Sequence, residues 1–227
     1  MSAAPEADLF WPDSCRLIPS RFPPVSLFEQ VATPADLDIV FAIEALGNPR
    51  LRQQVGELSL VPPAERISGP GTSAIMAAFT HLNPEGSRFS DGSYGVYYAA
   101  ESLETAVAEV SHHRARFLAS TSEPPLELDL RCYRVMVRAR LLDVRGQGGE
   151  LHDAQSYQAS QRFAREQRAA GALGIAYDSV RRPGGSCVAL FTPRATQPPA
   201  RQAEHVSLVW DGQRIAAWYL KSELHSL

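Results

Sequence analysis

The stretch Gly86–Arg114, GSRFSDGSYGVYYAAESLETAVAEVSHHR, predicts a loop, a strand and a helix in immediate succession. Its first part is rich in glycine, serine and aspartate, which favour turns, and it carries one arginine, Arg88. The apolar and aromatic run Tyr94–Ala100 that follows is typical of a buried strand. Ser102 then precedes a helical pattern and predicts an N-cap, with Thr105 three positions on where a full capping box has an acidic residue or glutamine.

The helix predicted after Ser102 carries a stripe of apolar side chains at three- and four-residue steps. The stripe consists of Leu103, Ala106, Val107, Val110 and Phe117. At about 100° per residue, Glu109 lies at the margin of this stripe rather than on the solvent face, and His113 follows one turn later. Glu109 therefore reads either as a half-sheltered carboxylate beside Arg88 and Tyr98 or as a helix-surface residue paired with His113 or Arg116.

The run from Arg88 to Glu109 has the form R-F-S-D-G-x-Y-G-V-x-Y-A-A-x-S-x-x-T-A-V-A-E. This run resembles the signature of the RES-domain family, whose members are bacterial toxins of toxin–antitoxin pairs and are similar to ADP-ribosyltransferases. The family is named for an arginine, a glutamate and a serine, and the first two match Arg88 and Glu109. The resemblance extends roughly from Arg66 to Leu220 and does not cover residues 1–60.

The resemblance places the serine of the family name at the end of a later strand. The segment Gly174–Arg181 fits that position, and the apolar strand Cys187–Phe191 follows it. We therefore expect Ser179 to be the site serine, and Ser186 remains the alternative. Family members often have proline before this serine, whereas this chain has Asp178.

The resemblance also implies a set of NAD-binding residues. They are Arg66, Arg88, Tyr98 and Ser179. Arginine suits a pyrophosphate because its planar guanidinium can bind two phosphate oxygens at once and does not lose its proton. The ring of Tyr98 would stack on nicotinamide or ribose. The expected catalytic residues are Arg88, Glu109 and Ser179, and Glu109 would stabilise the positive charge that develops on the ribose as nicotinamide leaves.

The activity that the resemblance implies is cleavage of the nicotinamide–ribose bond of NAD, which is a substrate here, without a metal. ADP-ribose would pass to phosphate or water and so deplete NAD. Two alternatives stay open: transfer of ADP-ribose to a target protein, and a module that binds a nucleotide or a partner without turnover. The expected partner is a cognate antitoxin with an Xre-like DNA-binding part, in a hetero-oligomer; a homodimer also stays open.

Composition narrows the class of protein. The 227 residues are enough for one large domain, and 44% of them are hydrophobic. A net charge of −3 gives no basic field that would attract nucleic acid directly. The three cysteines are widely spaced, as in a reduced cytosolic protein. Neither a signal peptide nor a membrane span is expected, so the predicted location is cytoplasmic.

Adjacent histidines His112 and His113 point about 100° apart on a helix, which argues against a shared metal.

Helices and strands that do not alternate strictly predict an α+β fold rather than a doubly wound one. We expect split mixed or antiparallel β-sheets with flanking helices, the ADP-ribosyltransferase-like arrangement that the resemblance implies. Val61-Pro62-Pro63 marks a boundary between a proline-rich and helical extension, residues 1–60, and a RES catalytic domain, residues 61–227. Residues 1–32 are expected to be an extended arm on the body, followed by a helix over Pro34–Leu46.

Overall fold

The computed structural model describes residues 4–21, 27–30, 34, 37 and 56–221. The helix expected over Pro34–Leu46 falls outside these residues, apart from positions 34 and 37. Within the described part of the chain, no helix is both long and apolar enough to cross a membrane.

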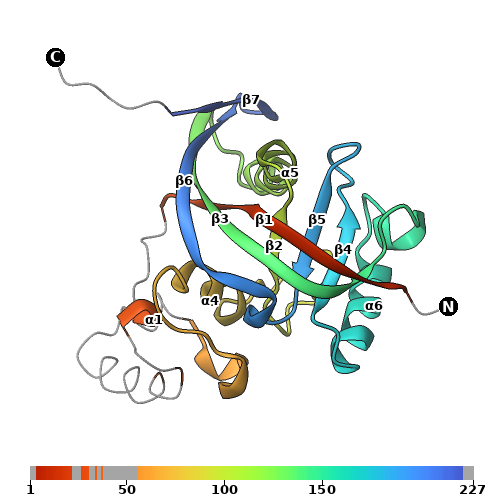
Figure 1. The fold of residues 1–227 in the computed structure, drawn as a ribbon. Coiled ribbons are helices and arrows are strands. Elements are labelled where there is room, and N and C mark those ends of the chain that lie inside the picture. Colours follow the sequence, from red (N-terminus) through yellow and green to blue (C-terminus); the bar gives the residue numbers. More distant parts are fainter. Residues whose placement is uncertain (1–3, 22–26, 31–33, 35–36, 38–55, 222–227) are drawn as a thin grey trace.

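The fold is built on one mixed sheet of seven strands (Figure 1). The strands are β1 (Glu6–Pro19), β2 (Tyr97–Ala100), β3 (Leu126–Asp143), β4 (Gly174–Asp178), β5 (Ser186–Leu190), β6 (Thr196–Trp210) and β7 (Ile215–Leu220). Their order is β1-β2-β5-β4-β3-β6-β7, and β1 also pairs with β3. β4 runs parallel to β3, whereas the other pairings between the described strands are antiparallel. Together with the helices, this confirms the predicted α+β class.

The strand β3 joins the two halves of the sheet. β1 pairs with it from Glu6 opposite Leu142 to Pro19 opposite Leu130, and so occupies one edge. A strand has two edges, so β6 and β4 must both pair with the second edge of β3, one after the other along its length. β6 pairs up to Val137 of β3, and β4 pairs at Leu142. The sheet therefore splits along β3, with β6 and β7 on one branch and β4, β5 and β2 on the other.

The structure corrects the expected character of residues 1–32. The segment Glu6–Pro19 is a strand within the sheet rather than an arm laid on its surface. Its side chains alternate as in a half-buried strand, since Leu9 and Trp11 are buried and Phe10 between them is 58% exposed. The domain boundary near residue 60 stays a prediction, but β1 is part of the sheet on which the rest of the chain is built.

Three longer helices pack around the sheet. They are α4 (Ser73–Thr80), α5 (Leu103–Thr121) and α6 (Gln158–Ala169). The predicted N-cap of α5 is confirmed, because the hydroxyl of Ser102 accepts a hydrogen bond of 3.3 Å from the backbone N–H of Thr105. Shorter pieces are α1 (Leu27–Gln30) and the 3₁₀ turns η2 (Leu58–Leu60), η3 (Pro63–Glu65), η4 (Gly149–His152) and η5 (Pro193–Ala195).

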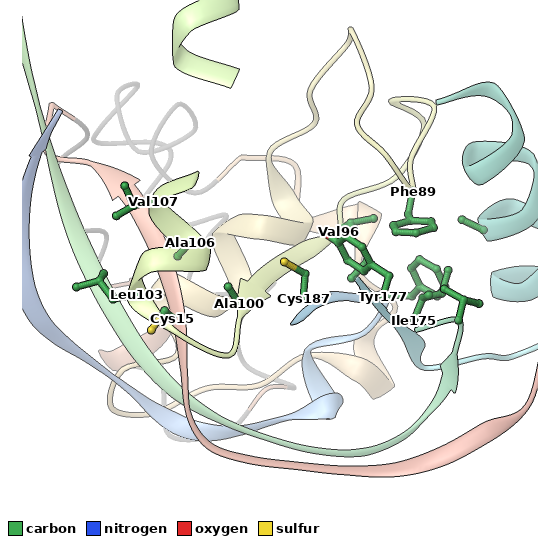
Figure 2. Packing of buried hydrophobic residues seen from close by; sticks show 14 of the residues in the cluster. Cys15, Phe89, Val96, Ala100, Leu103, Ala106, Val107, Ile175, Tyr177 and Cys187 are labelled. Atoms are coloured by element: carbon green, nitrogen blue, oxygen red, sulfur yellow. The ribbon is translucent and has the colours of Figure 1, made fainter. Parts of the chain in front are cut away.

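Two clusters of buried apolar residues flank the sheet. One of them includes Phe89 of the loop and Leu103 of α5, and it therefore holds the loop and the helix of the Gly86–Arg114 stretch in place. Figure 2 shows Leu103, Ala106 and Val107 at one end of this cluster and Phe89, Ile175 and Tyr177 at the other. The rings of Phe89 and Tyr177 meet edge to face, with centroids 4.9 Å apart. Burial of Phe89, the residue after Arg88, therefore pins the arginine-bearing loop to β4.

A close backbone approach holds α4 against the chain that enters β2. A Cβ atom placed on Gly95 would lie 2.4 Å from the Cα of Phe79 and 2.5 Å from the carbonyl oxygen of Ala78. Both neighbours are backbone atoms of α4, so they cannot move aside by changing a rotamer. Glycine is therefore required at position 95 for space.

We expect Gly95→Ala to lower the free energy of unfolding by about 1–3 kcal/mol, because the added methyl group pushes α4 away from β2. In a chain of this size the melting temperature should fall by roughly 2–12 °C. Thermal unfolding followed by circular dichroism measures the shift, and the exposed neighbour Ser93→Ala is the control, with a change of at most about 0.5 kcal/mol expected. A Gly95→Ala protein as stable as the wild type would contradict the close packing.

Candidate active site

A cavity of about 400 Å³ opens between β1, β2, α5 and the end of α4. Its volume lies in the range of sites that hold a small molecule. Arg88, Tyr98 and Glu109, the three residues singled out in the stretch Gly86–Arg114, all line it. The structure therefore brings together the loop arginine, the strand tyrosine and the helix glutamate.

Arg88 is nearly buried, with 5% of its surface exposed. Its Nη1 donates to the carbonyl oxygens of Leu151, at 3.1 Å, and Asp153, at 2.9 Å. The guanidinium also lies 4.7 Å from the centre of the Tyr157 ring. Its other terminal nitrogen, Nη2, is buried and has no hydrogen-bond partner among the described residues. An anion in the cavity would satisfy that donor and the charge together.

Glu109 is hydrogen-bonded to Ser179. The Ser179 hydroxyl donates to Oε1 of Glu109 at 2.6 Å. The same hydroxyl oxygen accepts from the backbone N–H groups of Arg181, at 3.2 Å, and Arg182, at 3.0 Å. These two amides orient the hydroxyl so that its proton points at the carboxylate. The alternative serine, Ser186, stands in β5 opposite Asp178. The hydrogen bond to Glu109 is made by Ser179.

Ser179 itself is buried behind Glu109 and does not line the cavity. It acts on the cavity through the carboxylate, whose orientation it restricts. The strand end at Asp178 and the turn after it therefore matter to the site because they place this hydroxyl.

Tyr98 holds the loop on both sides of Arg88. Its hydroxyl is 2.7 Å from the hydroxyl of Ser87 and accepts from the backbone N–H of Phe89 at 2.9 Å. Burial raises the pKa of Tyr98 well above its ordinary value, so the phenol stays protonated. The neighbouring Tyr97 faces the other side of β2 and stacks on Phe79 in the core.

Arg66 lies apart from this cavity. Its Nε donates to the carbonyl oxygen of Val61 at 2.8 Å, and its Nη2 lies 3.4 Å from that of Leu58. It is buried and is not among the residues that line the cavity. These contacts hold the turns η2 and η3 together, and a role for Arg66 in binding a ligand stays a prediction.

A different arginine, Arg16 of β1, does line the cavity. Its Nη1 donates to the carbonyl oxygen of Tyr98 at 3.0 Å, and its guanidinium lies 4.8 Å from the ring centre of Tyr97. Its Nε is buried without a hydrogen-bond partner in the described part of the chain. The sequence analysis missed Arg16 because it lies more than sixty positions before the decisive stretch. The pairing of Cys15 with Ala100 brings it to the cavity, and only the alternation along β1 hints at its direction.

His113 lines the cavity one turn after Glu109 on α5. The His113 side chain is exposed at the rim of the cavity, but partial desolvation of its ring, followed by the positive charges of His112, Arg181 and Arg116, lowers the pKa of His113 to about 4. The imidazole is therefore neutral near pH 7, and the positive charge of the cavity comes from Arg16 and Arg88. Among the described residues, no three or more histidine, cysteine, aspartate or glutamate side chains gather in a group that could hold a metal ion.

The arrangement suits an anionic ligand. Arg16 and Arg88, which line the cavity, each have a buried N–H group without a partner among the described residues, and Glu109, held by a serine, lines it from α5. A carboxylate fixed in this way can stabilise a positive charge that develops on a bound sugar.

Three comparisons relate this chain to known proteins. A sequence model described as the RES domain matches residues 63–211. A protein of Sinorhizobium fredii (strain NBRC 101917 / NGR234), described as uncharacterized protein y4oC, is 33% identical over 206 residues, which are 90% of this chain and 85% of that protein. The crystal structure of the M. tuberculosis MbcT–MbcA toxin–antitoxin complex overlaps with 57% of this chain and 74% of that chain, at 15% identity and a TM-score of 0.41.

The lowered pKa of His113 predicts a defined loss of stability in acid. Between about pH 6.5 and pH 4 the unfolded chain binds a proton at this residue and the folded chain does not, so the free energy of unfolding falls as the pH falls. We expect His113→Gln, which cannot titrate, to lose less stability than the wild type between pH 7 and pH 4.5, and by less than the full pKa shift would give, because solvent screens the exposed imidazole. Urea unfolding at both pH values measures this difference. The exposed His205→Gln, which removes a histidine outside the cavity, is the control. Equal losses of stability in all three proteins would show that His113 does not cause the loss in acid.

Proposed function

The chain belongs to the RES-domain family, and on that premise we propose that it cleaves the nicotinamide–ribose bond of NAD as the toxin of a toxin–antitoxin pair. One observation carries the proposal: Arg88, whose buried Nη2 has no hydrogen-bond partner among the described residues, and Glu109 line the same cavity. NAD offers a partner for each, a pyrophosphate for the arginine and a ribosyl centre for the carboxylate. The cavity extends beyond the matched residues, since Arg16 of β1 also lines it.

Arg88 would bind the pyrophosphate. Its Nη1 is already committed to two backbone carbonyls, which fix the plane of the guanidinium and leave Nη2 to meet a phosphate oxygen. A charge-assisted hydrogen bond from a fixed, nearly dry guanidinium is among the stronger polar contacts. Arg16 would supply a second positive charge from β1 and so help to hold an elongated dianion.

Glu109 would act on the reacting centre. As the bond to nicotinamide breaks, positive charge builds on the ribose C1′, and a nearby carboxylate stabilises it. The hydrogen bond from Ser179 keeps the carboxylate in one orientation before the substrate arrives. The ring of Tyr98 would form an apolar wall for nicotinamide or ribose, because its hydroxyl is engaged with the loop.

The acceptor of the ADP-ribosyl group is phosphate or water in this proposal, with nicotinamide as the leaving group. Either acceptor depletes NAD, which accounts for toxicity. The proposed partner is a cognate antitoxin with an Xre-like DNA-binding part, produced together with this chain. Transfer to a protein is the alternative that the experiment below separates.

The purified chain should release nicotinamide from NAD, and mass spectrometry should find ADP-ribose or, with phosphate present, its phosphorylated form. Glu109→Gln should lower kcat by about 100-fold or more and change the dissociation constant of NAD by only a few-fold. The reason is that the positive charge on the ribose, which Glu109 stabilises, develops only in the transition state. The exposed Glu104→Gln on the same helix is the matched control and should keep full activity. NAD that stays intact with the wild type, in the presence and absence of phosphate and of cell lysate, would sink the proposal; protein-bound ADP-ribose with lysate would favour the transferase.

Arg88→Lys should lower kcat/KM by roughly 10- to 100-fold although the charge is kept. Lysine cannot donate to the carbonyls of Leu151 and Asp153 and to a phosphate in one plane, and its ammonium does not stack on Tyr157. Initial rates of nicotinamide release measure the loss. The exposed Arg165→Lys, which keeps its ion pair with Asp91, is the control. Wild-type rates in Arg88→Lys would show that charge at this place is enough.

A further inference from the structure

The four residues Leu151–Ala154 connect the loop that carries Arg88 to the turn that carries Ser179. We propose that this segment is a clasp that sets the two halves of the site relative to each other, and that His152 is its positioning residue. The inference rests on the proposed function for its kinetic consequence. Its structural consequence is independent of any substrate.

One side of the clasp holds Arg88. The carbonyl oxygens of Leu151 and Asp153, the two neighbours of His152, accept the hydrogen bonds from Nη1 of Arg88. The Asp153 carboxylate in turn accepts from the backbone N–H groups of Gln155, at 2.6 Å, and Ser156, at 3.0 Å. This local turn holds the Asp153 carbonyl in the direction in which Arg88 needs it.

The other side of the clasp holds the turn of Ser179. The backbone N–H of Asp178 donates to Nε2 of His152 at 3.1 Å. Nη2 of Arg181 donates to the carbonyl oxygen of Ala154 at 2.6 Å. Asp178 and Arg181 stand on either side of Ser179, so its turn is tied to the clasp at two points.

The bond between Asp178 and His152 determines the state of the imidazole. A backbone N–H can only donate, so Nε2 must be unprotonated and the ring proton must lie on Nδ1. Nδ1 lies 3.4 Å from the carbonyl oxygen of Gly148, in the direction where that proton can point. His152 is therefore a neutral acceptor in this structure.

The glycines before the clasp make no packing contacts. Gly146, Gly148 and Gly149 all have positive φ angles, of 71°, 62° and 75°. No atom lies within 4 Å of a Cβ built on any of them. The Gly146 N–H donates to the Asp178 carboxylate at 2.6 Å, and Leu151 packs against the apolar cluster that contains Phe89. The hydrogen bonds made by the clasp add to these contacts in setting where Leu151 and Asp153 present their carbonyls. Loss of the His152 acceptor would remove one of the two hydrogen bonds that tie the turn of Ser179 to the clasp.

A pair of substitutions separates the acceptor from the shape of the ring. His152→Phe keeps a planar side chain of similar size but cannot accept a hydrogen bond, whereas the Oε1 of His152→Gln can reach the place of Nε2. We expect hydrogen exchange at the Asp178 amide, followed by NMR, to be at least about tenfold faster in His152→Phe and near the wild-type rate in His152→Gln. In wild-type protein, the ring nitrogen signals should report the tautomer with the proton on Nδ1.

The kinetic readout uses nicotinamide release from NAD. His152→Phe should lower kcat by about tenfold or more and leave KM within about twofold, because the Ser179–Glu109 pair acts mainly in the transition state. His152→Gln should recover most of kcat. The exposed His205→Phe is the matched control and should match the wild type in both constants.

Equal exchange at the Asp178 amide in the phenylalanine and glutamine variants, or a wild-type tautomer with the proton on Nε2, would overturn the clasp. A loss of kcat that is the same in both variants would also do so, since it would depend on stability rather than on the acceptor. If the wild type does not turn over NAD at all, the proposed function fails, and the tautomer and exchange measurements still decide on the clasp.

Discussion

The structure depends on the two edges of one long strand, β3. β1 occupies one edge, and β6 and β4 share the other, so the sheet branches where β6 leaves and β4 begins. The branch of β4, β5 and β2 carries Ser179 at one strand end and leads into α5 with Glu109 at the other. Because backbone hydrogen bonds of a sheet must be made edge by edge, this branching sets where every element of the site can lie.

The arginines of the cavity are the second constraint. Arg88 is buried and Arg16 is half-buried, and each uses one terminal nitrogen on backbone carbonyl oxygen and its flat face on an aromatic ring. Removing an arginine from water costs several kcal/mol unless the arginine is paired. Each of these two arginines has an N–H group without a partner among the described residues, and a bound anion would satisfy it. The same feature that costs stability in the empty cavity would contribute affinity when a phosphate is bound.

The loop of residues 146–154 shows how a weakly packed segment can still be positioned. Its glycines make no packing contacts, and its carbonyls and one imidazole are bound by Arg88 and by the turn that carries Ser179. Such a device adjusts a site by hydrogen bonds rather than by packing, so single substitutions within it should change geometry more than fold.

The sequence by itself determined the local parts: the α+β pattern and the loop, strand and capped helix of Gly86–Arg114, because turn residues, caps and apolar periodicity act over a few neighbouring positions. Arg88, Tyr98 and Glu109 share that short stretch, so their proximity could be predicted. The tertiary structure alone decided that β1 completes the sheet, that Arg16 rather than Arg66 lines the cavity, and that Ser179 bonds Glu109. These contacts join residues far apart in the chain, and strand pairing and register depend on the whole sheet rather than on any local pattern.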